Sequence, residues 1–109
     1  MLRTDIIAPL HVLLKRNAGE HPQKIAYRDA KRSTTYGELA DATANLAGHL
    51  SETGLQAGDR VAIWLPNSVE WIEACFAVTR AGGVGVPISY EATESEVLYR
   101  IEDADCRIL

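Results

Sequence analysis

The glycine-rich segment Gly82-Gly83-Val84-Gly85 is the first place in this chain where chemistry on a phosphate could be sought. Loops that cradle phosphates place their glycines between a strand and a following helix, so that the amides of the helix N-terminus face the anion. Here the apolar pattern predicts the reverse order, with a helix before the glycines and a strand after them. The segment is therefore predicted to end a helix and to allow close packing of that helix on a strand. The only strand-to-helix loop with good amide donors is Pro66-Asn67-Ser68, which could support weak ATP binding although Pro66 lacks an amide.

Acidic and sulfur-containing side chains offer two further possibilities, a metal site and a reactive thiol. Glu102, Asp103 and Asp105 carry oxygen ligands of the kind that Mg²⁺ and Ca²⁺ prefer, but an acidic run without other ligands more often forms a solvated helix end. Cys75 and Cys106 lie in apolar contexts without a CxxC partner, which favours buried, reduced thiols over a disulfide or a metal pair. The three histidines show no metal-ligand spacing.

Three other residues have simpler explanations than binding or catalysis. Tyr36 and Trp64 could stack on an adenine ring, although aromatic side chains more often fill a core. Glu38 stands three residues after Thr35, which is the spacing of a capping box, in which each side chain bonds the other residue's backbone amide. Glu38 is therefore expected to begin a helix rather than to act as a catalytic carboxylate.

Length and charge exclude several classes of protein. The 109 residues, 47% of them hydrophobic, suit one small domain or part of a larger one. The net charge is −4 and all three lysines lie in the first third, so no basic stripe can neutralise nucleic-acid phosphates and no nucleic-acid partner is expected. No apolar run reaches the length of a membrane span, and no cleavage site of small residues follows the segment 1–14. A cytoplasmic protein is therefore expected.

The hydrophobic periodicity predicts an α/β fold. An N-terminal helix over 7–18 should precede a β-hairpin with strands 24–28 and 34–36, and a long helix should follow over 35–53. From Arg60 onward, short strands alternate with helices, which is typical of a parallel βαβαβ unit. The predicted strands of this unit are 60–65, 84–88 and 106–109, and the predicted helices are 69–81 and 94–104. Because the last strand starts four residues before the end, the parallel sheet is expected to be incomplete at the C-terminus.

Several segments of the chain also carry recognisable motifs. They are Thr35-Tyr36-Gly37-Glu38-Leu39, Gly58-Asp59-Arg60-Val61-Ala62-Ile63 with Leu65-Pro66-Asn67-Ser68, and Arg80-Ala81-Gly82-Gly83-Val84-Gly85-Val86-Pro87-Ile88. Their order and spacing, together with a later helix that ends in Asp103-Ala104, resemble the AMP-forming acyl-CoA synthetases of the adenylate-forming superfamily. The resemblance implies that residues 1–109 form the N-terminal part of the large domain of such an enzyme, without a second domain.

The resemblance implies a two-step reaction for the full-length enzyme. A carboxylate attacks the α-phosphate of Mg·ATP to give an acyl-adenylate and pyrophosphate, and the thiol of CoA then displaces AMP. In the family these steps use a Thr/Ser/Gly-rich loop with a Lys, a ribose-binding Asp and a Lys on a mobile C-terminal domain, and none of these motifs occurs in this sequence. No residue is therefore assigned as catalytic, cofactor-binding or metal-binding. ATP, Mg²⁺, CoA and a small-molecule carboxylate are implied for the full-length enzyme, whereas the isolated chain is expected to bind no cofactor and to be inactive.

Two other interpretations stay open. The first is an adenylation-domain fragment of a peptide synthetase, although such domains usually have an Asp–Pro pair soon after the Val–Pro motif and residues 88–92 lack it. The second is a stand-alone small α/β module that binds a partner.

We predict that the chain by itself associates into a homodimer or a higher oligomer. The predicted helix 69–81 is apolar on most of its sides, and Ile108-Leu109 would leave an unpaired apolar strand end. Exposed apolar patches and open strand edges both favour contact with another chain. Sedimentation velocity at tens of micromolar should show the oligomer, and a monodisperse monomer would contradict the prediction.

Overall fold

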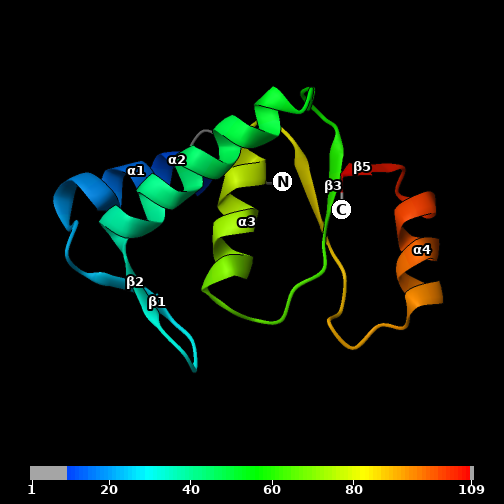
Figure 1. Ribbon diagram of the computed structural model, residues 1–109. Coiled ribbons are helices and arrows are strands. Elements are labelled where there is room, and N and C mark those ends of the chain that lie inside the picture. Colours follow the sequence, from blue (N-terminus) through cyan, green and yellow to red (C-terminus); the bar gives the residue numbers. More distant parts are fainter. Residues whose placement is uncertain (1–9, 109) are drawn as a thin grey trace, which may run out of the picture.

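A computed structural model describes residues 10–108 as four helices and five strands in two separate sheets (Figure 1). The elements are α1 (Leu10–Glu20), β1 (Ile25–Arg28), β2 (Ser33–Thr35), α2 (Tyr36–Glu52), β3 (Arg60–Ile63), α3 (Val69–Arg80), β4 (Val84–Pro87), α4 (Glu94–Asp103) and β5 (Cys106–Ile108). Every predicted helix and strand is present, which confirms the α/β fold class. Residues 7–9 of the predicted first helix and residue 109 of the predicted last strand lie outside the described residues.

The N-terminal unit consists of α1, the β1–β2 hairpin and α2. The two strands pair antiparallel, as predicted, and form a sheet of their own. The capping box at the start of α2 is present: the Thr35 hydroxyl accepts from the amide of Glu38 at 3.1 Å, and the Glu38 carboxylate accepts from the amide of Thr35 at 3.0 Å. At the other end of α2, Gly54 has a φ of 94°, and the amide of Leu55 donates to the carbonyl of Leu50. This is the expected Schellman ending.

The second unit is the predicted parallel βαβαβ unit. Strand β3 lies in the centre of a three-stranded sheet with the order β4-β3-β5, and both pairings are parallel. The register places Arg60 beside Val84 on one side and beside Cys106 on the other. The strand order shows that the chain crosses from β4 past β3 before it forms β5.

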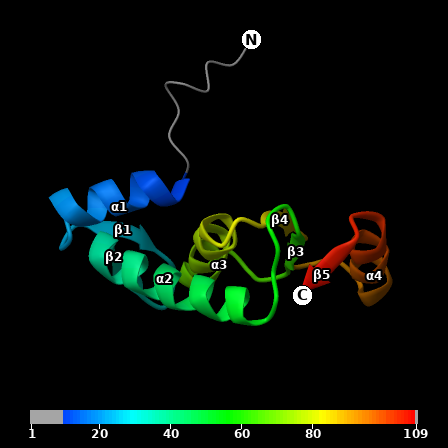
Figure 2. The same cartoon turned by 90° about the horizontal axis from the view of Figure 1, so that it is seen from above.

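Alternation of side chains along β3 decides which helix covers which face of this sheet. Successive side chains of a strand point to opposite faces. Val61 and Ile63 pack in a cluster with Val78 of α3, whereas Ala62 packs in a second cluster with Val97 of α4. The two helices therefore cover opposite faces, and Figure 2 shows them on opposite sides of the strands.

Helix α3 is the element shared by both units. It packs against α1 and α2 on one side and against β3 and β4 on the other. Only Glu70 and Arg80 among its residues are exposed, and its apolar side chains are buried or half-buried within the chain. Helix α3 therefore no longer supports the predicted self-association. Other exposed apolar groups, such as Leu98 and Tyr99 of α4, would have to form the contact. The self-association stays a prediction.

The glycines after α3 end the helix and bring it close to the sheet. Gly82 has a φ of 87°, and the amide of Gly83 donates to the carbonyl of Val78 at 2.9 Å, as in a Schellman ending. A Cβ on Gly83 would lie 3.2 Å from the Asp59 carbonyl oxygen, a Leu55 methyl carbon and a Val78 methyl carbon. This confirms the interpretation of the glycine-rich segment as a helix end with close packing.

None of the helices within residues 10–108 combines the length and the hydropathy that crossing a bilayer requires.

Two glycine-to-alanine substitutions should shift stability in opposite directions. Gly48→Ala should raise the free energy of unfolding by about 1 kcal/mol. Gly48 lies at an exposed position inside α2, and no atom lies near the added methyl group. Gly83→Ala should lower the free energy of unfolding by roughly 1–3 kcal/mol, because the methyl group would overpack the contact between helix and sheet. Urea denaturation of both variants beside the wild type measures the two changes. Equal effects of the two substitutions would contradict the described packing at Gly83.

Candidate functional site

The topology of the parallel sheet places a crevice at the carboxyl ends of β3 and β4. The loop after β3 leads to α3 on one face of the sheet, and the loop after β4 leads to α4 on the other face. In open α/β sheets, two neighbouring strands whose loops diverge in this way leave a crevice between them, and ligands bind there. Residues 10–108 contain one such pair of divergent loops, so this crevice is the candidate functional site.

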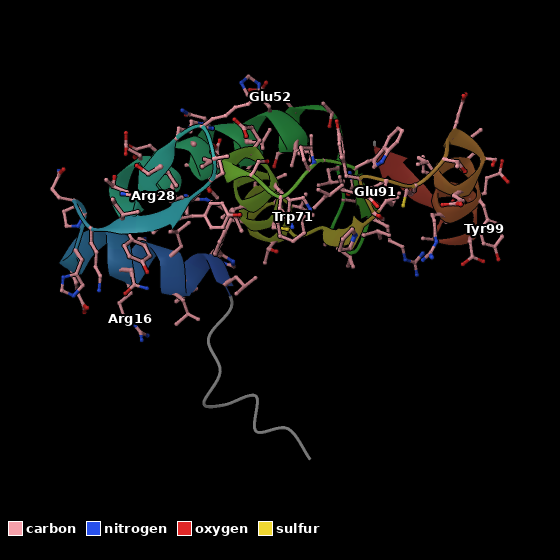
Figure 3. All side chains as sticks on the ribbon, turned by 90° about the horizontal axis from the view of Figure 1, so that it is seen from below. Arg16, Arg28, Glu52, Trp71, Glu91 and Tyr99 are labelled. Carbon is pink, nitrogen blue, oxygen red and sulfur yellow. The ribbon has the colours of Figure 1, made fainter. Side chains whose placement is uncertain are left out.

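The crevice has a volume of about 410 Å³, within the range of small-molecule sites. Figure 3 views the molecule from the side of these loops, and Trp71 and Glu91 lie near each other in the middle of that view. Six of the nine residues that line the crevice are apolar or aromatic, and three are polar. The lining residues are Leu65, Pro66, Asn67 and Trp71 on the α3 side and Pro87, Ile88, Ser89, Tyr90 and Glu91 on the α4 side.

The N-terminus of α3 borders this crevice, but its amides already have partners within the chain. The amide of Val69 donates to the Asp29 carboxylate at 2.9 Å, and the amide of Trp71 donates to the Ser68 hydroxyl at 3.2 Å. The backbone amide of Glu70 is the first cause of the lowered pKa of the Glu70 carboxyl, followed by the Arg32 side chain. Two carboxylates thus stand where a helix N-terminus would otherwise attract a phosphate. The structure therefore gives no support to the expected weak ATP binding at the 66–68 loop. The amides of the adjoining helix end already have partners, and the carboxylates beside them would repel a phosphate.

The Asp29 carboxylate comes from the turn of the hairpin, far away in sequence. Its Oδ1 accepts from the amides of Lys31 and Arg32 at 2.7 and 2.8 Å, while its Oδ2 accepts from the amide of Val69. The Arg32 guanidinium then donates to Glu70 and to Glu73 of α3, both at 2.8 Å. We call Asp29, Arg32, Glu70 and Glu73 the hairpin clasp. It joins the hairpin turn to the first turn of α3, beside the crevice.

The structure places the other candidate residues of the sequence away from the crevice. Gly82 and Gly83 precede β4, and Val84 and Gly85 are its first residues, so the segment 82–85 lies at the amino end of that strand. Tyr36 borders a separate, mostly apolar pocket between α1, the hairpin and α3. Trp64 packs with the cluster beneath α4. Glu38 is engaged in the capping box, as expected.

The acidic end of α4 has a structural explanation. Asp105 adopts a φ of 54°, the left-handed conformation that ends a helix, and its amide donates to the carbonyl of Glu102. Residues 10–108 bring together no three His, Cys, Asp or Glu side chains that could hold a metal ion. Cys75 and Cys106 are free thiols, and burial raises the pKa of both.

Sequence reasoning missed both the crevice and the hairpin clasp. Asn67 belongs to the 66–68 loop that the sequence singled out, but Trp71, Ser89 and Glu91 belong to no pattern that marks a site, and only the divergence of two loops brings them together with it. An Asp in a hairpin turn is a known turn signal, but its bond to Val69, forty residues away, has no local signature.

Comparison with known proteins identifies the family. The sequence profile of AMP-binding enzymes matches residues 14–109, so the chain belongs to the AMP-binding enzyme family. The chain is 38% identical to chalcone synthase cfoA from Aspergillus candidus over 109 residues, which are 100% of this chain and 4% of that protein. It is 34% identical to the nonribosomal peptide synthetase sirP from Leptosphaeria maculans over 96 residues, which are 87% of this chain and 4% of the relative. It is 31% identical to a 3-oxocholest-4-en-26-oate–CoA ligase from Rhodococcus rhodochrous over 84 residues, which are 77% of this chain and 15% of the relative.

Solved structures share the fold. The N-terminal subdomain of NpsA from Klebsiella oxytoca matches with a TM-score of 0.86 and 26% identity, over 94% of this chain and 27% of that one. VinN in complex with 3-methylaspartate matches with a TM-score of 0.88 and 27% identity, over 93% of this chain and 28% of that one. The chain therefore spans about a quarter of the solved chains and much less of the curated relatives.

The hairpin clasp should make stability depend on pH. The pKa of the Asp29 carboxyl lies below its usual range, first because the Val69 amide donates to it and then because the Arg32 and Lys31 amides do. A carboxyl whose pKa is lower in the folded state contributes stability above its unfolded pKa and loses it as the pH falls through the folded pKa. Asp29→Asn should therefore be less stable than the wild type at neutral pH. The difference should begin to shrink as the pH falls below the usual Asp pKa of about 3.9, and it should vanish below the lowered pKa of the folded state.

Urea denaturation at a series of pH values measures this difference. The matched control is Asp41→Asn, because Asp41 is an exposed carboxylate on α2. If the free energy of unfolding of Asp29→Asn differs from that of the wild type by the same amount at every pH, the role assigned to the Asp29 carboxylate is contradicted.

Proposed function

We propose that this chain is the N-terminal part of an enzyme that uses ATP to activate a carboxylate as an acyl-adenylate. The observation that carries the proposal is the match of residues 14–109 to AMP-binding enzymes. Support also comes from the similarity to the solved NpsA chain, which in one structure is described as part of an artificially fused adenylation–PCP di-domain, with a TM-score of 0.86 and 26% identity.

In the proposed reaction a carboxylate oxygen attacks the α-phosphorus of ATP, and pyrophosphate leaves with the electron pair of the bond that breaks. Such a step requires fixed donors and cations around the phosphates. The chain has no lysine after Lys31, and the carboxylates of Asp29 and Glu70 stand at the N-terminus of α3. We therefore assign the binding of the triphosphate and of Mg²⁺ to residues outside this chain. In this proposal the chain contributes the parallel sheet and a crevice close to the reacting groups.

The second step of the proposed reaction is transfer of the acyl group to a thiol, with release of AMP. The resemblance of the motifs to acyl-CoA synthetases and the relative that is a CoA ligase favour CoA as the thiol. The peptide synthetases among the relatives, including sirP and the AMB antimetabolite synthetase AmbB from Pseudomonas aeruginosa, favour a thiol on a carrier domain instead. Adenylation is common to both and is the function that we propose.

The test is ATP–pyrophosphate exchange with a panel of aliphatic, aromatic and amino-acid carboxylates. The protein encoded by the complete reading frame around these residues should show exchange that depends on one class of carboxylate and on Mg²⁺. The 109-residue chain alone should show no exchange, because the removal of even one donor to a developing charge commonly costs about 100-fold or more in rate. Exchange by the chain alone would contradict the assignment of the phosphate-binding groups, and no exchange by the complete protein would contradict the proposed function.

The acceptor is then identified with the same carboxylate. Formation of an acyl-CoA on addition of CoA, measured by chromatography against a reaction without CoA, supports the CoA ligase. Acylation of a carrier domain without any acyl-CoA supports the peptide synthetase. A complete reading frame that ends at residue 109, with a partner protein bound, would support the stand-alone module.

A further inference from the structure

The hairpin clasp links two parts of the fold that share no backbone pairing. The β1–β2 hairpin and the β4-β3-β5 sheet are separate sheets, and Figure 1 shows the tip of the hairpin beside the loop that leads into α3. A pocket between the hairpin turn and residues 66–68 separates the two backbones, so the clasp bridges them with side chains. These side chains therefore link the 66–68 loop to the hairpin directly, in addition to the packing of α1 and α2 on α3.

A single carboxylate connects the two backbones because its two oxygens serve different segments. Oδ1 of Asp29 orders the hairpin turn through the amides of Lys31 and Arg32, and Oδ2 holds the amide of Val69, the first residue of α3. An amide side chain at this position has only one acceptor oxygen and would have to give up one of the two segments.

The Arg32 guanidinium adds a second link on the same helix. It reaches Glu70 and Glu73, which lie three residues apart and therefore on one face of α3. The planar fork of an arginine can bond two carboxylates at once, which a lysine ammonium does less well. Because Arg32 and Glu70 are about half exposed, with side chains 48% and 57% accessible, the pair contributes little to global stability. Its main effect is on the position of the first turn of α3.

That first turn forms one wall of the candidate site. Val69 directly follows Ser68, whose hydroxyl caps the amide of Trp71, and Trp71 lines the crevice together with Pro66 and Asn67. A shift of Val69 would therefore move the aromatic wall relative to Ser89 and Glu91 across the crevice.

We propose that Asp29 and Arg32 are positioning residues that hold the β3–α3 wall of the crevice in its working place. The proposal rests on the proposed adenylation function, because the site that they position is a site of that enzyme. Neither residue lines the crevice, so they act through Val69, Glu70 and Glu73 and not by contact with a substrate.

The experiment uses the complete enzyme with three variants: Asp29→Asn, Arg32→Lys and the control Asp41→Asn. Steady-state kinetics are measured for the carboxylate, for ATP and for the thiol acceptor. A displaced wall should raise the KM of at least one substrate in Asp29→Asn and Arg32→Lys, with kcat/KM lower by on the order of tenfold, because small misplacements in a site cost rate steeply. Asp41→Asn should match the wild type.

Hydrogen exchange measured on the same proteins reports the position of the wall without reference to catalysis. The amides of residues 67–72 other than Val69 should exchange faster in Asp29→Asn and in Arg32→Lys than in Asp41→Asn. If all three KM values and this exchange stay at the wild-type level, the proposal is overturned, even when kcat falls through loss of folded enzyme. If the wild type itself shows no pyrophosphate exchange, the proposed function fails, and hydrogen exchange alone then decides whether the clasp positions the wall.

Discussion

Strand β3 has to be covered on both faces, and most of the fold follows from this requirement. Val61, Ala62 and Ile63 are at most 5% exposed although consecutive residues point to opposite sides of the sheet. A single helix can cover one face only, so α3 and α4 must lie on opposite faces. The chain meets this requirement by forming β4 on one side of β3 and β5 on the other. The loops after β3 and β4 then diverge, and the crevice between them is a consequence of the same burial.

Helix α3 packs against both the sheet and the N-terminal unit, and so connects the two. It packs on the sheet with one side and receives α1 and α2 on the other, so that a helix with few polar residues can be almost fully covered within a small chain. Among the described residues, the strands of the hairpin do not pair with the strands of the larger sheet. The hairpin turn reaches α3 through the charged side chains of the hairpin clasp.

The electrostatics at the start of α3 also separate this unit from the familiar phosphate-binding folds. In those folds a helix N-terminus after a strand is left open for an anion. Here Asp29 and Glu70 supply the negative charge from within the chain, and Ser68 caps a further amide. The α3 terminus therefore binds the hairpin turn, which is consistent with our proposal that other residues bind the triphosphate.

Local sequence determined the elements and several of their ends, although β3 ends at Ile63 and not at the predicted residue 65. The Thr35/Glu38 capping box forms, and the glycine turn after α3 forms as well, because each depends on residues within one or two helical turns of one another. Apolar alternation and helix spacing were sufficient to predict a parallel βαβαβ unit, and the motifs were sufficient to indicate the family. The crevice and the bond from Asp29 to Val69 were decided by tertiary structure alone. They join segments about 20 to 40 residues apart, and no local pattern states which face a helix will cover or which distant amide a turn carboxylate will reach.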